Sequence, residues 1–139
     1  MWKRTNLILI GMAFLVGTTA RAEEPVALRV TNMGVTPAHM PLVAVWVKNL
    51  GDVSYEGSIR LELPEGWSSS VPAQDVSLKR GETASARFTI HDGKNRMENR
   101  YTVTAVAKGA GQEVRRSQEI VCASAPYFKP DIDGRVDDW

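Results

Sequence analysis

Residues 84–90, ASARFTI, alternate apolar and polar side chains without interruption. The apolar members are Ala84, Ala86, Phe88 and Ile90, and the polar members are Ser85, Arg87 and Thr89. Successive side chains of a β-strand point to opposite faces of the sheet, so this period of two predicts a strand with one buried face and one wet face. No window of the chain has a convincing helical period of apolar residues.

The same alternation recurs in three other stretches on either side of this one. Their apolar sets are Val43, Val45 and Val47; Ile59, Leu61 and Leu63; and Tyr101, Val103, Ala105 and Ala107. The first of these stretches differs from the others, because Leu42, Ala44 and Trp46 make its second face apolar too. We expect a central strand there, partly covered by a neighbouring loop or domain, with Trp46 in the core.

Seven short runs in all are predicted to be strands, at 26–31, 42–48, 55–63, 76–79, 84–90, 101–108 and 113–122. Turn signals rich in Gly, Pro, Asn and Asp separate many of them. This regular spacing predicts an all-β fold, an immunoglobulin- or fibronectin-like antiparallel β-sandwich of about seven strands. Tyr101 follows the polar connection 91–100, where such sandwiches often have a tyrosine that bonds back to the backbone. Plain core packing explains this tyrosine equally well.

The N-terminus has the three parts of a signal peptide. Lys3 and Arg4 supply positive charge, residues 7–16 are an uncharged apolar run, and Ala20 and Ala22 form an A-x-A cleavage site. The run is shorter than the roughly 18 apolar residues that span a bilayer, so no stable membrane anchor is expected. We expect residues 1–22 to be removed on export to the periplasm, the cell surface or the extracellular space.

Cleavage after Ala22 gives a direct prediction. N-terminal sequencing of the exported protein should begin at Glu23, because the small side chains of Ala20 and Ala22 fit the peptidase. A mature chain that still starts at Met1 would show that the segment is retained.

The rest of the chain divides into three parts. Residues 23–122 are expected to form the sandwich, 123–130 a linker stiffened by two prolines, and 131–139 the start of a truncated second domain. The chain has 17 Lys and Arg and 16 Asp and Glu, and loss of 1–22 removes three of the bases. A mature chain with a small acidic excess has no basic footprint for nucleic acid.

The sequence contains no catalytic or metal-binding pattern, so we expect no enzyme activity, no metal site and no cofactor. His39 and His91 lie in polar connections and are expected to be solvated. Cys122 is the single cysteine and sits in an apolar run, which favours a buried thiol. The acidic tail does not fit a calcium loop, because Lys129 would occupy the first ligand position.

Sugar binding needs exposed flat aromatic rings, and the sandwich offers two tryptophans. Trp46 lies among valines, and Trp67 follows the turn at 64–66, where it is expected to plug one end of the sandwich. Trp67 remains a weak candidate for ligand binding. With both rings expected in the core, the isolated sandwich is expected to bind polysaccharides weakly or not at all.

Several turn and core motifs resemble the domain that accompanies sugar-binding NPCBM modules in alpha-galactosidases, which is similar to other fibronectin-like spacer domains. The matching residues are Asn49, Gly51, Leu63, Pro64, Gly66, Trp67, Gly81, Glu82, Tyr101 and Val103. Arg80 departs from the pattern, which has proline there. The resemblance covers about residues 26–122 and implies a β-sandwich more firmly than any function.

A second resemblance lies in the tail. Ile132, Asp133 and Gly134, followed by Asp137, Asp138 and Trp139, resemble the opening of family nine carbohydrate-binding modules. The resemblance implies that a sugar-binding domain follows the linker.

Together these observations predict a non-catalytic accessory or spacer module of an exported, multidomain, carbohydrate-related protein. Its expected partner is carbohydrate, reached through the downstream domain. Two alternatives stay open: a carbohydrate- or protein-binding module in its own right, and the accessory domain of a secreted glycoside hydrolase.

Overall fold

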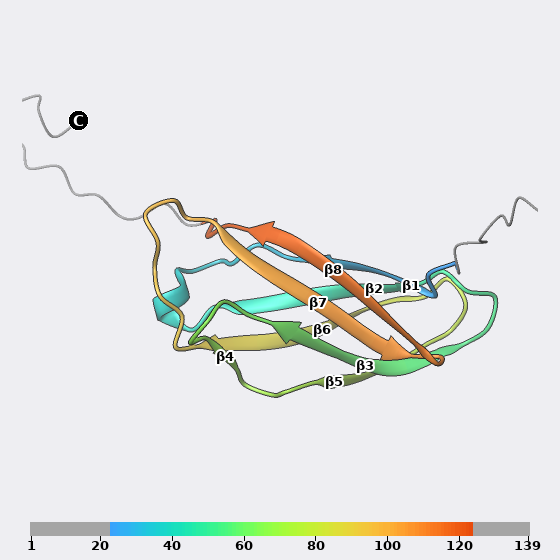
Figure 1. Ribbon diagram of the computed structural model, residues 1–139. Helices are drawn as coiled ribbons and strands as arrows, with labels where there is room; N and C mark the ends of the chain where they lie inside the picture. The colour runs from blue at the N-terminus through green and yellow to red at the C-terminus, as the bar shows by residue number, and fades with distance from the viewer. Residues whose placement is uncertain (1–22, 124–139) are drawn as a thin grey trace, which may run out of the picture.

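The computed structural model describes residues 23–123, which form two packed β-sheets (Figure 1). The strands are β1 (Val26–Val30), β2 (Leu42–Asn49), β3 (Tyr55–Glu62), β4 (Ser68–Ser69), β5 (Gln74–Leu78), β6 (Thr83–His91), β7 (Tyr101–Gly109) and β8 (Gln112–Ile120). A single 3-10 turn, η1 (Pro37–His39), joins β1 to β2. Residues 1–22 and 124–139, which hold the expected signal peptide and second domain, lie outside the described part.

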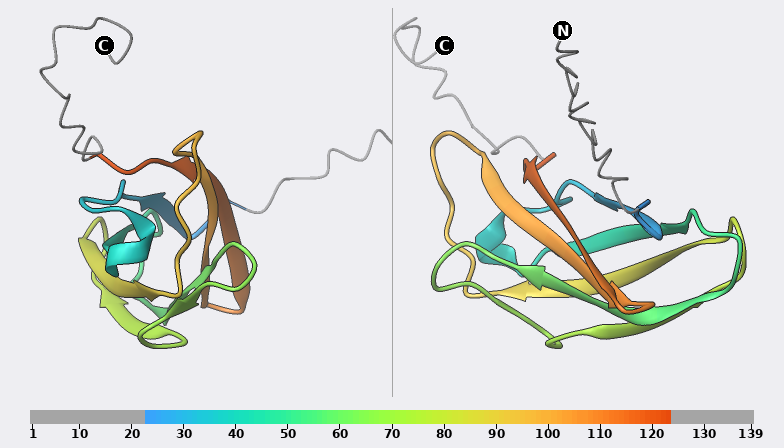
Figure 2. Two further views of the ribbon diagram at one scale, coloured as in Figure 1. Left: turned by 90° about the vertical axis from the view of Figure 1, so that its left-hand side faces the viewer. Right: turned by 45° about the vertical axis from the view of Figure 1, so that its right-hand side comes forward.

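One sheet has the strand order β1-β2-β6-β4 and the other β5-β3-β7-β8, with every paired strand antiparallel. Figure 2 shows the sheets as two layers that face each other. The predicted all-β sandwich is therefore confirmed, and each of the seven expected strands is present within two residues of its predicted bounds. The eighth strand, β4, was not expected, because two residues are too few to show any alternation.

The core lies between the inner faces of the sheets, where the predicted apolar sets meet. Phe88 on β6 is fully buried, as are Val45 on β2 and Ile59 on β3. The period of two therefore assigned the inner faces correctly. The expectation for Trp46 was wrong, since 47% of this residue is exposed. Its neighbours Val45 and Val47 point inward, and the parity of the strand turns Trp46 outward.

Glutamine side chains close the seams between the two sheets. The Gln118 amide, from β8, accepts a hydrogen bond from the Val30 nitrogen at 3.1 Å and donates one to the Val30 oxygen at 2.8 Å. On the other side of the sandwich, Gln74 bonds the nitrogen and the oxygen of Arg87 in the same way. Each amide thus satisfies backbone groups that a neighbouring strand would otherwise pair.

Tyr101 bonds back to the backbone, which was one of the two expectations for this residue. Its hydroxyl accepts a hydrogen bond from the Arg96 backbone nitrogen at 2.9 Å. The residue is 2% exposed, so its ring packs in the core while its hydroxyl holds the long connection before β7.

After β8 the chain stays tied to the body of the domain. Met33 donates to the Val121 oxygen at 3.0 Å, and the Ala123 nitrogen donates to the Met33 oxygen at 2.7 Å. The Asn99 side chain bonds both backbone groups of Cys122, each at 2.9 Å. Together with a hydrogen bond from the Val121 nitrogen to the Asn32 side chain at 3.2 Å, these contacts fix the last described residues.

The Cys122 thiol is buried as expected, with 7% of the residue exposed. A thiol reagent such as Ellman's reagent should modify it slowly in the native protein and quickly in denaturant, because reaction requires the surrounding structure to open. Absorbance of the released thiolate follows both rates in one sample. Immediate labelling of the native protein would show that the thiol is accessible.

Candidate functional site

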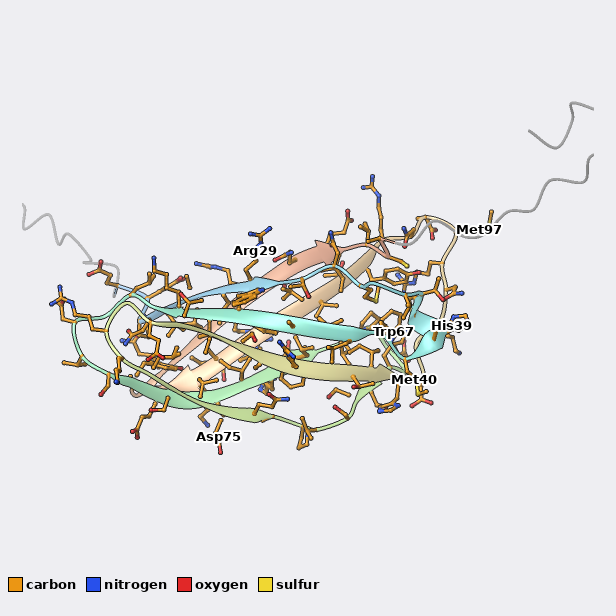
Figure 3. The ribbon with its side chains drawn as sticks, turned by 180° about the vertical axis from the view of Figure 1, so that it is seen from behind. Arg29, His39, Met40, Trp67, Asp75 and Met97 are labelled. Atoms are coloured by element: carbon orange, nitrogen blue, oxygen red, sulfur yellow. The ribbon has the colours of Figure 1, made fainter. Side chains whose placement is uncertain are left out.

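Trp67, the weak candidate from the sequence, is half-buried at one end of the sandwich. Figure 3 shows it at the same end as His39 and Met40. Its ring packs against Tyr101, with ring centroids 5.2 Å apart and planes tilted by 46°. Trp67 belongs to the rim of the core, which leaves little of its ring face available to a ligand.

Trp46 offers a more accessible ring, on the outer face of the β1-β2-β6-β4 sheet. In the strand pairing it lies opposite Arg29 of β1 and opposite Ser85 of β6. Residues directly opposite each other in an antiparallel pair point to the same face, with Cβ atoms about 5 Å apart. Arg29 and Ser85 therefore flank the indole, and Figure 3 shows Arg29 projecting away from the sandwich.

Two further cations share this face. Lys48 is two residues along β2 from Trp46, and Arg87 is two residues along β6 from Ser85. Two residues along a strand span about 7 Å, so Lys48 and Arg87 each lie in a row of side chains next to the row that contains the indole. All three basic side chains are exposed. We call the surface formed by Arg29, Trp46, Lys48, Ser85 and Arg87 the Trp46 face.

The outer face of the opposite sheet is organised differently. There Arg60 bonds Glu62 at 2.6 Å, Arg115 also bonds Glu62, and Arg115 pairs with Glu113 at 3.0 Å. Hydrogen bonds from Arg60 and Arg115 hold the pKa of Glu62 below its ordinary value. In the strand pairing Val106 lies between Arg60 and Arg115 and is fully buried. These charged side chains therefore pair with one another.

A groove of about 960 Å³ lies near the β7–β8 turn on that same side. Gly57 and Gly109 are among its lining residues, and a Cβ atom at either position would clash with the Tyr55 ring and with the backbone of the paired strand. Its lining carries Glu56, Asp75 and Lys108, charges of both signs, and no aromatic ring. The groove therefore lacks a surface on which a sugar or another flat ligand could stack.

The described residues contain no group of three or more His, Cys, Asp and Glu side chains that could hold a metal ion. His39 bonds Thr36 at 2.7 Å in an exposed turn, and His91 ends β6. Within 23–123 no helix is long and apolar enough to cross a membrane. Ala20 and Ala22, the expected cleavage site, lie outside the described residues.

Comparison with known proteins gives a family and solved structures of similar fold. The sequence profile of the NPCBM-associated, NEW3 domain of alpha-galactosidase matches residues 40–109, half of the chain. The crystal structure of a FixG-related protein from Vibrio parahaemolyticus is similar, with a TM-score of 0.52 and 12% identity over 73% of this chain and 99% of that chain. At this identity the likeness concerns the fold. No curated protein matches the chain.

Proposed function

Since the chain belongs to the NPCBM-associated, NEW3 domain family of alpha-galactosidase, we propose that it is a non-catalytic spacer module of an exported, carbohydrate-related protein. In this role the sandwich holds the domain that follows it at a set distance and direction. The proposal rests on how the chain enters and leaves the sandwich.

The described chain enters at one end of the sandwich and leaves at the other (Figure 1). At the first end the Leu50 nitrogen donates to the Pro25 oxygen at 2.9 Å, and at the second Ala123 is bonded to Met33. The two ends are separated by about the length of β8, about 30 Å for a nine-residue strand. Domain termini often lie close together, whereas here the two ends of the described chain lie at opposite ends of the sandwich, so a domain that follows is held away from the N-terminus.

The direction in which the chain leaves is also fixed. The bonds from Asn99 to both backbone groups of Cys122, together with those between Met33 and its two partners, hold the backbone as far as Ala123. A rigid point of departure followed by a proline-stiffened linker transmits the orientation of the sandwich to the next domain. This clamp at residues 121–123 is the single observation that carries the proposal.

The remaining parts of the proposal are supported by the sequence. The pattern at residues 1–22 supports export, and residues 131–139 support a following sugar-binding domain similar to family nine. The family itself, named for a domain of alpha-galactosidase, supports an accessory role beside carbohydrate-active domains.

The test uses the full-length protein with one spin label in the sandwich and one in the domain after residue 130. Electron–electron distance measurements should give a narrow distribution for the native protein. Replacing linker residues 124–130 by a Gly/Ser segment of the same length should broaden it, and Asn99→Ala should broaden it partly, because that change releases Cys122.

Asn95→Ala is the matched control, because Asn95 makes one exposed hydrogen bond to Ala38 and none to the C-terminal residues. Binding of the full-length protein to insoluble glycans, measured by pull-down, tests the carbohydrate role separately. Equal distance distributions for the native and Gly/Ser proteins would refute the spacer role. Failure to retain any glycan would refute the carbohydrate role.

A further inference from the structure

We propose that the Trp46 face binds an anionic polysaccharide, with a sugar ring stacked on the Trp46 indole and its acidic groups paired with Arg29, Lys48 and Arg87. This goes beyond a spacer, which needs no ligand. The starting observation is that a large aromatic residue, expected in the core, is 47% exposed in the middle of a sheet.

Apolar side chains extend along β2 from the indole. Ala44 and Leu42 share the outer face with Trp46, and 53% of Leu42 is exposed. β2 is flanked by β1 and β6, so this row lies within the sheet rather than at its edge. An exposed apolar strip rimmed by polar groups is typical of a binding surface. Tryptophan suits such a site, because it combines a broad apolar ring with a polar N–H.

The charge on the Trp46 face has a single sign. The strands β1, β2 and β6 contain no Asp or Glu, and their Arg29, Lys48 and Arg87 form no ion pair among the described residues. On the opposite sheet the arginines Arg60 and Arg115 are neutralised by glutamates. The Trp46 face is therefore free to pair with external acidic groups.

The arrangement of these cations suits an extended ligand. Lys48, Arg29 and Arg87 stand in three successive rows across the sheet, with the indole in the middle row. Rows are about 7 Å apart, so the three charges cover about 14 Å along the strands. The hydroxyl groups of Thr83, Ser85 and Thr89 point to the same face and can bond sugar hydroxyls. A flexible chain of acidic sugars can offer a ring face to the indole, acidic groups to the cations and hydroxyl groups to the Ser and Thr side chains at the same time.

Other polyanions fit the surface less well. Nucleic acid binding draws on many phosphate contacts, and here three cations stand on a domain whose remaining charges are largely balanced. An acidic peptide can satisfy the cations, but it leaves the indole without a flat partner. The combination of one central ring with separated cations and hydroxyls therefore favours acidic sugars.

The experiment uses residues 23–123, which contain the whole core. The similar Vibrio structure supports this choice, because the match covers 99% of that chain, so this fold occurs there as a chain of its own. Calorimetry should detect saturable binding to at least one of polygalacturonate, alginate and heparin. Binding should weaken as salt is raised, because exposed ion pairs are screened. Fully methyl-esterified polygalacturonate, which keeps the sugar rings without charge, and polyglutamate, which has charge without rings, should each bind at least about tenfold more weakly, a difference of about 1.4 kcal/mol.

Variants locate the site. Trp46→Ala should weaken binding about tenfold or more, and Arg29→Gln and Arg87→Gln several-fold each, with circular dichroism unchanged. Lys108→Gln removes an exposed cation from the opposite sheet and should leave binding unchanged. Trp46 and Trp67 are the tryptophans of 23–123, so a ligand-induced fluorescence change that disappears in Trp46→Phe would report contact with Trp46 itself.

Absence of binding to all three polysaccharides would overturn the proposal, and so would equal binding of polyglutamate that is insensitive to Trp46→Ala. Binding abolished by Lys108→Gln instead would place the site on the other sheet and also refute it. None of these results bears on the distance distributions that test the spacer role, so the two proposals can fail independently.

Discussion

Replacing Phe88 by alanine should lower the free energy of unfolding by about 3–5 kcal/mol. Phe88 is fully buried on the inner face of β6, and it lies opposite Val43 of β2 in the strand pairing. The substitution removes the transfer energy of a large apolar side chain and leaves a cavity that a rigid β-sandwich fills incompletely. Because most single domains are stable by only about 5–15 kcal/mol, this loss takes a large part of the total.

Urea or guanidinium unfolding of residues 23–123, followed by circular dichroism, measures the effect as a lower midpoint with an unchanged slope. Thr102→Ala is the matched control, since Thr102 is exposed on β7 and its loss should change stability by less than about 0.5 kcal/mol. A midpoint for Phe88→Ala equal to that of the control would show that Phe88 contributes little to the core.

The second large effect is expected at Asn49, the one buried polar residue among those described. Its Nδ2 donates to the backbone oxygens of Val53 at 2.8 Å, Lys79 at 3.1 Å and Leu78 at 3.3 Å. Its Oδ1 accepts from the Gly51 nitrogen at 2.9 Å. One amide therefore ties the loop after β2 to the end of β5. Asn49→Ala should cost about 3 kcal/mol, because several backbone groups lose their partner.

Asn49→Asp keeps the shape of the side chain but removes its NH2 donor, so it tests the donor by itself. The carboxylate keeps an acceptor for Gly51, but it places negative charge against three carbonyl oxygens. This variant should therefore be at least as unstable as Asn49→Ala at neutral pH. The exposed Asn95 again serves as the control, with Asn95→Ala expected to change little. Denaturant midpoints that are the same for wild type and both Asn49 variants would contradict the structural role.

The sequence predicted the strands and their inner faces because alternation is a local property that packing then uses directly. Phe88, Ile59 and Val45 are buried where the period of two placed them. β4 was not predicted, because its two residues form a strand only through their pairing with β6, and no local sequence pattern reveals that pairing. The amide contacts of Gln118 and Gln74 were also unpredictable, since they join segments 88 and 13 residues apart.

The candidate site was harder to predict than the fold. Trp46 was assigned to the core from its valine neighbours, although its parity with Leu42 and Ala44 already put it on the opposite face from Val45. The sequence could show that this face is apolar, but it could not show whether anything covers it. The cations were equally hidden, because Arg29, Lys48 and Arg87 come together only through the register of three strands.

The placement of the two chain ends has a mechanical consequence. A force that pulls Pro25 and Ala123 apart acts almost along the strands, because β1 and β8 run in the same direction between the two ends (Figure 1). The hydrogen bonds that join β1 to β2 and β7 to β8 are then loaded in shear, many at the same time. Peeling, in which bonds break one after another, needs both ends on the same side. The sandwich is therefore arranged to resist tension applied between its two ends.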